Sequence, residues 1–209
     1  MTSLIIARHG NTFTPDQTPT RVGKATDIPL VESGFLQAEA LGRALAEKGL
    51  IPDIVYTSNL QRTQQTAHRA LEVLNRPLEP ISDPRFDEID YGPDENKTEE
   101  EVIARIGQDA IDQWNKNAIV PPGWNIDPEA IQHSWMEFAD EILQKHPEQV
   151  VMVVTSNGVG RFAPYITGDF EEFRRHHPLK LKTGAYGIFE YDGHNWHVME
   201  WNSRPAAVD

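Results

Sequence analysis

Polar and charged side chains directly follow three apolar runs of the sequence. They are Arg8, His9, Gly10 and Asn11 after "LIIA", Ser58, Asn59 and Arg62 after "DIVYT", and Ser156, Asn157 and Gly158 after "VVMVVT". Apolar runs of this length that end in small and polar residues are typical of buried strands. In open α/β sheets, ligands bind beyond the carboxyl ends of the strands. We therefore expect these side chains to meet at one edge of a sheet.

Arginine and histidine at such an edge have the chemistry of phosphoryl transfer. Arg8 and Arg62 can each hold phosphate oxygens with parallel N–H groups. His9 can attack phosphorus through a ring nitrogen or relay a proton, and Gly10 is expected to let the backbone approach the ligand. In the loop "FDEIDYG", Glu88 is placed to protonate a leaving alkoxide. This set of residues needs no metal ion, so the sequence predicts no cofactor.

Each of these residues alone is weak evidence for a site. Arg62 by itself is most often a solvated helix arginine, and Glu88 by itself is most often a surface acid. An Arg-His-Gly triplet occurs by chance in about one chain in a hundred of this size. Because all of these residues fall at the same predicted sheet edge, we interpret them as one phosphate site.

Several other cations leave their role open. Arg21 and Lys24 lie in the loop after the first strand. They either add positive charge for a second anionic group of the substrate or are simply solvated. The same two alternatives hold for Arg161, Arg174 and Arg175.

Tryptophan and histidine residues suggest two further sites, which the pattern supports less well. A substrate pocket can be lined by Trp114, Trp124 and Trp135, although helical spacing favours a core position for Trp114 and Trp135. Adjacent histidines on a strand or loop point apart, so no metal site is predicted. The histidines concerned are His176, His177, His194 and His197.

The composition limits the classes of partner. A formal net charge of −13 is expected to repel nucleic acid and anionic membranes, but not a small anionic substrate held by local positive charge. The 209 residues include no cysteine, which excludes disulfides and thiolate zinc sites. No run approaches the ~20 apolar residues of a membrane span, and the start "MTSLIIARHG" does not have the pattern of a signal peptide. The expected partner is a small phosphorylated metabolite in the cytoplasm, with no nucleic acid and no membrane.

Strands alternate with helices through most of the chain. Apolar residues recur at helical spacing over 34–48, 60–74, 98–114 and 128–142. The second of these helices is expected to be capped by Ser58 or Asn59, and "TEEE" opens the third with a capping box.

The C-terminal part is predicted to differ from this alternation. Two strands within 184–201 flank Asp192-Gly193, a typical hairpin turn. The predicted fold class is therefore α/β, with a mostly parallel sheet covered on both faces and an antiparallel hairpin at one edge. We expect one domain over 1–209, in which 93–135 forms a helical cap or insertion over the site.

The sequence resembles the histidine phosphatase superfamily, which is also called phosphoglycerate mutase-like. The resemblance lies in "ARHGNT", "TDIPL", "SGFLQAEALG", "TSNLQRTQQTA" and "FDEIDYG", and it resumes at the strand 149–161. It implies a three-layer α/β/α sandwich with a cap, and no cofactor. It also implies that His9 is the nucleophile that becomes phosphohistidine. Arg8 and Arg62 would bind the phosphoryl group, and Glu88 would protonate the leaving group.

The chain departs from the pattern of this family at two places. The family usually reads His-Gly-Gly after the last core strand, and that histidine is a second phosphate ligand. Here Ser156 falls at the histidine position, followed by Asn157 and Gly158, and the family's Trp-Glu-Gly is replaced by Asp94-Glu95-Asn96. Together with Asn11, Ser156 and Asn157 are then expected to face the phosphate as neutral donors.

Two functions follow from this sequence. The first is a metal-independent phosphohydrolase that acts on a small phosphomonoester through a phosphohistidine at His9. The second is a phosphate-binding pseudoenzyme with little or no turnover, because Ser156 replaces the second histidine. A mutase is less favoured, since no feature that retains the substrate is identifiable.

Overall fold

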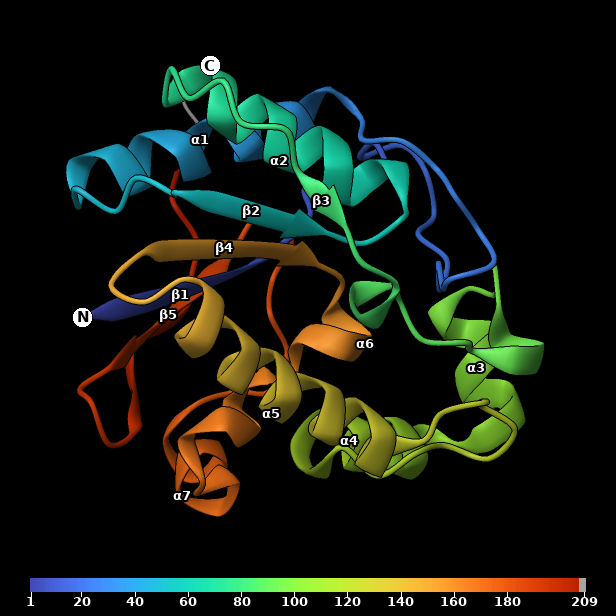
Figure 1. Ribbon diagram of the computed structural model, residues 1–209. Helices are drawn as coiled ribbons and strands as arrows, with labels where there is room; N and C mark the ends of the chain where they lie inside the picture. Colours follow the sequence, from blue (N-terminus) through green and yellow to red (C-terminus); the bar gives the residue numbers. More distant parts are fainter. Residues whose placement is uncertain (207–209) are drawn as a thin grey trace.

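A six-stranded sheet forms the middle layer of the computed structural model, which describes residues 1–206 (Figure 1). The order of the strands is β3-β2-β4-β1-β5-β6. Their bounds are Thr2–Arg8 (β1), Ile54–Thr57 (β2), Ile81–Ser82 (β3), Val150–Thr155 (β4), Tyr186–Tyr191 (β5) and Trp196–Ser203 (β6). Strands β1 to β4 pair in parallel, whereas β5 is antiparallel to β1 and β6 is antiparallel to β5. The predicted α/β fold, with a mostly parallel sheet and an antiparallel hairpin at one edge, is confirmed.

Helices cover both faces of this sheet. In Figure 1, α1 and α2 lie above the sheet, and α5 and α7 lie below it. The helices are Glu32–Glu47 (α1), Gln61–Val73 (α2), Glu99–Ile106 (α3), Gln108–Asn117 (α4), Pro128–Lys145 (α5), Asn157–Gly160 (α6) and Phe170–His176 (α7). Short 3₁₀ turns add Pro84–Phe86, Gly92–Asp94 and Ala163–Thr167. Within residues 1–206, no helix combines the length and the apolar character that a membrane span requires.

Strand β1 is buried on both faces and divides the core into two layers. Leu4 and Ile6 pack on the side of α5, and Ile5 and Ala7 pack on the side of α1 and α2. Successive side chains of a strand point to opposite faces, so a short apolar run fills both layers. This burial explains why the run "LIIA" has no polar alternation.

The segment between β3 and α5 differs from the prediction of one long helix over 98–114. Helix α3 ends at Gly107, whose φ of +83° is unfavourable for a residue with a side chain, and α4 begins at once in a new direction. The capping box at the start of α3 is present, since the Thr98 side chain accepts from the Glu101 N–H and the Glu101 carboxylate accepts from the Thr98 N–H. The extent of the cap over 93–135 stays a prediction.

The start of α2 also differs from the prediction. Its N-cap is Leu60, with no side-chain cap, and neither Ser58 nor Asn59 takes that position. Asn59 is instead held by the Asp87 carboxylate, which accepts its backbone N–H at 2.7 Å. This contact ties the carboxyl end of β2 to the acidic loop.

Candidate active site

A cavity of about 810 Å³ lies beyond the carboxyl ends of β1 and β4. Of the predicted site residues, its walls include Arg8, His9, Asn11, Glu88 and Asn157. Arg62 and Ser156 are fully buried and lie behind these walls. The predicted cap also contributes to the cavity, through Glu99 and Asn115.

The pairing of β1 with β4 brings together residues that are far apart in the sequence. Arg8 lies opposite Thr155, and the His9 N–H donates to the Thr155 carbonyl at 3.1 Å. Asn157 follows at the start of α6. Two parallel strands that end at the same level therefore deliver both sets of polar side chains to one place, as the sequence predicts.

His9 is held in one tautomer by its own backbone. Its Nδ1 lies 2.7 Å from the Gly10 carbonyl oxygen, an acceptor, so Nδ1 carries the proton and Nε2 keeps its lone pair. The ring is 6% exposed. Burial, assisted by the positive charges of Arg8 and Arg62, holds the pKa of His9 well below its ordinary value. At neutral pH the imidazole is therefore uncharged, which is the form that can act as a nucleophile.

Gly10 has a packing role that the sequence does not reveal. A Cβ at Gly10 would meet the Gly34 backbone oxygen at 2.3 Å, and a Cβ at Gly34 would meet the Asn11 oxygen at 2.2 Å. The two glycines let the first turn of α1 pack directly on the turn that carries His9. The Gly10 N–H also donates to the Thr66 hydroxyl of α2. Gly10 thus serves close packing of two backbones, and the expected close approach of the backbone to a ligand stays a prediction.

The depressed pKa of His9 leads to a pH prediction. We expect the His9 ring of the folded protein to remain neutral as the pH falls from 8 through 6.5. Histidine in an unstructured peptide, in contrast, gains its proton at about pH 6.5. Below about pH 6.5 the unfolded chain therefore binds more protons than the native one, so the free energy of unfolding decreases as the pH is lowered. An NMR titration of ring-labelled histidine, assigned with His9→Asn, measures this directly. Protonation of His9 at or above pH 6.5 would contradict the assignment.

Arg8 points one side of its guanidinium at the protein and leaves another side unpaired. Nη1 donates to the Leu181 carbonyl at 2.7 Å. Nε is buried and has no acceptor among residues 1–206. Burial lowers the pKa of Arg8 from its ordinary value, partly offset by the Glu88 carboxylate. A guanidinium in this position is charged and has an N–H group left for an anion.

Arg62 is fully buried and makes three bonds to the loop that follows the first strand. It donates to the carbonyl oxygens of Thr26 at 2.8 Å, Gly23 at 3.3 Å and Val22 at 3.4 Å. Its Nε, like that of Arg8, is buried and finds no acceptor within the described chain. Because a buried donor without an acceptor costs about 1–3 kcal/mol, two such donors near His9 favour an anion between them.

Glu88 lines the same cavity as Arg8 and is 5% exposed. Its oxygens accept from the Ile89 N–H at 3.0 Å, from the Gly158 N–H at 3.3 Å and from the Tyr91 hydroxyl at 3.4 Å. A Cβ at Gly158 would lie 2.3 Å from Glu88 Oε1, so only glycine leaves room for this carboxylate. Burial, followed by the charge of Glu88, raises the pKa of Tyr91, which remains a neutral donor.

The neutral polar side chains differ in what they leave free. The Asn11 amide donates to Ser33 and its oxygen accepts from Thr183. Asn157 Oδ1 accepts from the Leu181 N–H at 3.0 Å, which leaves its Nδ2 as a donor toward the cavity. The Ser156 hydroxyl is buried and has no partner among the residues that the structure describes.

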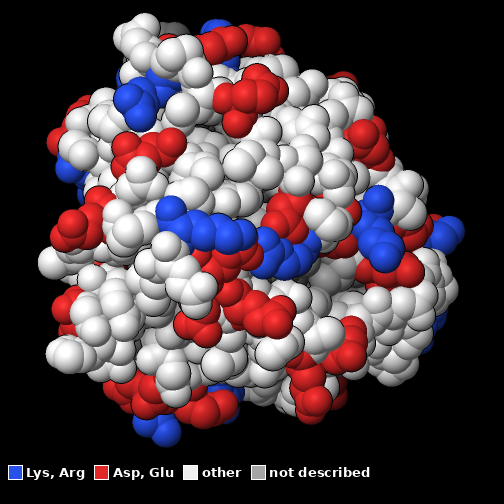
Figure 2. Space-filling view, viewed as in Figure 1, with Lys and Arg blue, Asp and Glu red and all other residues white. Residues whose placement is uncertain are grey.

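Positive charge is concentrated at this cavity although the whole protein is acidic. Figure 2 shows acidic side chains spread over the face seen in Figure 1. The cavity walls instead hold four cations, Arg8, Arg21, Arg161 and Lys180, against two carboxylates, Glu88 and Glu99. An anionic ligand is therefore favoured here in spite of a net charge of −13.

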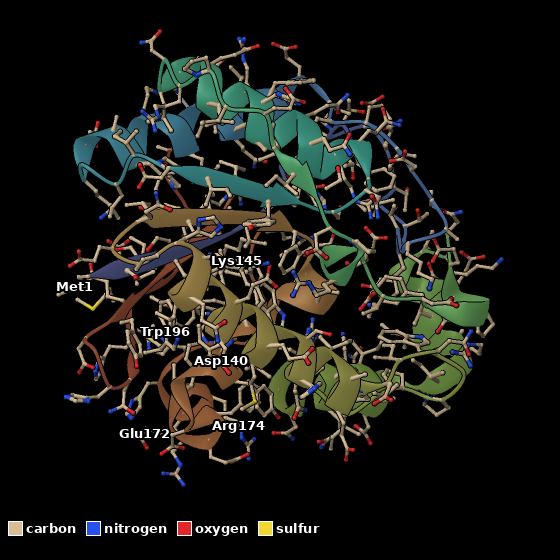
Figure 3. The ribbon with its side chains drawn as sticks, viewed as in Figure 1. Met1, Asp140, Lys145, Glu172, Arg174 and Trp196 are labelled. Atoms are coloured by element: carbon tan, nitrogen blue, oxygen red, sulfur yellow. The ribbon has the colours of Figure 1, made fainter. Side chains whose placement is uncertain are left out.

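Of the other residues whose role the sequence left open, some line the cavity and some do not. Arg161 and Arg21 line the cavity, but Lys24 does not. Arg174 and Arg175 pair with acids of their own helix α7, where Figure 3 shows Arg174 and Glu172, and neither arginine lines the cavity. All three tryptophans, Trp114, Trp124 and Trp135, are buried in the core. Lys180 was missed because it lies in a segment without periodicity or motif.

The fold and this site together define a class of protein. A mostly parallel sheet delivers Arg-His-Gly to a cavity with four cations in its walls, and a family model described as "Histidine phosphatase superfamily (branch 1)" matches residues 4–204. The chain belongs to this superfamily. Its members act as phosphatases or mutases, which supports phosphoryl transfer by way of a histidine in this chain.

Individual relatives agree on the family but differ in activity. A 2,3-bisphosphoglycerate-dependent phosphoglycerate mutase of Leifsonia xyli is 36% identical over 121 residues, which are 57% of this chain and 48% of the relative. The chain spans about half the length of the curated relatives that it matches first. YhfR of Bacillus stearothermophilus is 26% identical with a TM-score of 0.77 over 97% of both chains. A mycobacterial glucosyl-3-phosphoglycerate phosphatase shares the fold, with 20% identity and a TM-score of 0.79 over 96% of this chain and 98% of that one.

Proposed function

We propose that this protein is a metal-independent phosphohydrolase that acts on a small phosphomonoester by way of a phosphohistidine at His9. The observation that supports it most is the hydrogen bond from His9 Nδ1 to the Gly10 carbonyl. It leaves an uncharged Nε2 in a cavity that also holds Arg8 and Glu88. A nucleophile, a phosphate ligand and an acid are then in one place.

In the first step, Nε2 of His9 attacks phosphorus and the ester P–O bond breaks. Glu88 enters this step as the protonated acid, gives its proton to the departing alkoxide oxygen so that an alcohol leaves, and becomes a carboxylate. Arg8 and Arg62 hold the equatorial oxygens, with Asn11, Asn157 and Ser156 as neutral donors. Glu88 is the one free carboxylate of the described cavity walls, since Glu99 is paired with Arg21 at 2.5 Å.

In the second step, water attacks the phosphohistidine. The Glu88 carboxylate takes a proton from this water, and the P–N bond breaks to give phosphate and neutral His9. The bond from Nδ1 to the Gly10 carbonyl stabilises the positive charge that the ring carries while it is phosphorylated at Nε2. The enzyme then returns to its starting state without a cofactor.

A panel of phosphomonoesters tested in excess EDTA, with the parent protein beside His9→Ala, tests the proposal. Hydrolysis by the parent and none by the variant supports it. Activity that is lost on adding EDTA and restored by a divalent metal overturns it. The panel also separates hydrolysis from transfer to a second hydroxyl, which a mutase would catalyse.

A phosphate-binding pseudoenzyme is the second candidate, and Ser156 is the observation that favours it. The resemblance expects an imidazole at this position, whereas here a hydroxyl lies behind the cavity wall. Losing one charged donor to a transition state typically costs about 2.7–4 kcal/mol, or ~10²–10³ in rate. Binding of inorganic phosphate without hydrolysis of any panel member would favour this candidate.

Arg62→Lys should weaken binding of inorganic phosphate and vanadate by about 10-fold or more. Lysine keeps the charge but loses the planar fork and the Nε–H donor, and a charge-assisted hydrogen bond contributes roughly 1.5–3 kcal/mol. Inhibition constants for both ions measure the effect. Arg69→Lys is the matched control, since Arg69 lies on the same helix and pairs with Glu39 and Glu72 at the surface. Equal inhibition of both variants would remove Arg62 from the site.

A further inference from the structure

Arg161 is a buried cation that the proposed phosphoryl transfer does not use. Its side chain is 1% exposed and its guanidinium carbon lies 4.0 Å from the centre of the Trp114 ring. Nη1 donates to the Trp114 carbonyl at 2.7 Å, and Nε donates to the Asn157 carbonyl at 3.3 Å. Within residues 1–206 no carboxylate forms an ion pair with it, and Nη2 has no acceptor. Because Arg161 also lines the cavity, this unpaired N–H side faces the ligand space.

Lys180 is a second cation at the same cavity, and it too has no carboxylate partner in the described chain. The neighbouring residue Leu181 fixes its place, because the Leu181 N–H donates to Asn157 and the Leu181 carbonyl accepts from Arg8. Partial burial lowers the pKa of Lys180, the positive charges of Arg8 and Arg161 lower it further, and the Glu99 carboxylate offsets part of this effect. The ammonium group is therefore close enough to these guanidinium groups to be repelled by them.

Arg21 shows what a compensated cation looks like at this cavity. Its guanidinium bonds to the Glu99 carboxylate at 2.5 Å and packs over the rings of Tyr91 and Trp124. Arg161 is buried and packs over the Trp114 ring, and Lys180 is exposed, but neither forms an ion pair within the part of the chain that the structure describes. Two cations without an ion-pair partner at one cavity favour an anion from outside the chain.

These two cations lie beside the phosphoryl site around His9. Arg161 Nε donates to the Asn157 carbonyl, and Lys180 precedes Leu181, whose carbonyl accepts from Arg8. The cavity of about 810 Å³ is also far larger than one phosphate needs, and is in the range of sites for whole small molecules. There is thus room for a substrate with two charged ends.

We propose that Arg161 and Lys180 form a subsite for a second anionic group of the substrate, a carboxylate or a phosphate. The substrate class is then a small phosphomonoester that carries a further negative charge a few bonds from the ester. This inference rests on the proposed function for the first anionic group. Guanidinium and ammonium groups both bind carboxylate and phosphate oxygens through charge-assisted hydrogen bonds.

The test compares three-carbon phosphate esters that differ at the far end. The probes are 3-phosphonooxypropanoate, its neutral amide and 1,3-propanediol bisphosphate, with p-nitrophenyl phosphate as a substrate that has no second anionic group. We expect the parent to prefer the acid or the bisphosphate over the amide by about tenfold or more in kcat/KM. The better of the two identifies the group. Lys180→Gln and Arg161→Met should each reduce this preference several-fold.

Lys182→Gln is the matched control, because it removes the same charge two residues away and Lys182 does not line the cavity. Its preference for the charged probe should equal that of the parent.

If Arg161→Met does not fold, Lys180→Gln still decides, since Lys180 lies at the surface. Equal kcat/KM for acid, bisphosphate and amide in the parent overturns the subsite while hydrolysis of p-nitrophenyl phosphate leaves the proposed function intact. If no ester is hydrolysed, the proposed function fails, and calorimetry of the acid, the bisphosphate and the amide with His9→Ala still decides the subsite. Tighter binding of either charged probe than of the amide supports it, and equal binding of all three overturns it.

Discussion

His9→Ala should abolish covalent phosphorylation of the protein and lower kcat by about 10⁴ or more. The variant has no ring nitrogen to attack phosphorus, and the remaining donors can only stabilise charge. Brief mixing with ³²P-labelled ester, followed by an alkaline quench, should trap label that is stable to base and labile to acid in the parent alone. Phosphohistidine has this stability, whereas phosphoserine is more stable to acid.

His194→Ala is the control for this experiment, because His194 is exposed and lies in the turn between β5 and β6. It should trap as much label as the parent. Thermal unfolding of both variants shows whether the buried His9 ring was needed for stability rather than for chemistry. If His9→Ala retains the trapped label, another residue carries the phosphoryl group.

Glu88→Gln should slow alkyl phosphates by about 10²–10⁴ and aryl phosphates with good leaving groups much less. An alkoxide needs a proton as it leaves, whereas a nitrophenolate does not. Glutamine has almost the same shape and can still accept from the Ile89 N–H, so the change mainly removes the transferable proton. Measuring kcat/KM against the pKa of the leaving alcohol gives the slope that distinguishes the two cases.

Asp87→Asn is the matched control, since Asp87 directly precedes Glu88 and accepts hydrogen bonds from Asn59 outside the cavity. It should leave the dependence on the leaving group unchanged. An equal loss on alkyl and aryl esters in Glu88→Gln would mean that the carboxylate only holds Gly158 and Tyr91 in place.

The parts of the site that follow a strand directly were predictable from the sequence. The position of Arg8, His9 and Asn157 needs only the knowledge that buried strands end at a common edge, and the parallel pairing of β1 with β4 provides it. The position of Arg62 was harder to predict from the sequence. Its three acceptors lie in a loop 36–40 residues away, and no local pattern indicates that this loop returns to α2.

Other features depend on contacts or backbone angles that periodicity does not report. Gly10 faces Gly34, and the reason for either glycine appears only when α1 packs on the turn. The apolar spacing of 98–114 continues across Gly107, yet the helix is interrupted there because Gly107 has a positive φ. The position of Lys180 at the cavity depends on its neighbour Leu181, whose backbone is held by two long-range hydrogen bonds.

The central position of β1 has a consequence for how this protein is made. The strand, Thr2–Arg8, leaves the ribosome well before both of its neighbours, β4 at Val150–Thr155 and β5 at Tyr186–Tyr191. At roughly 5–20 residues per second, Leu4–Ala7 waits on the order of ten seconds without a strand partner. Such exposed apolar segments are prone to aggregation, and pairings across long sequence separations form slowly. A nascent chain stopped before residue 150 would hold His9, Arg62 and Glu88 and still have no assembled site, so catalytic capacity would be acquired in a single late event of translation.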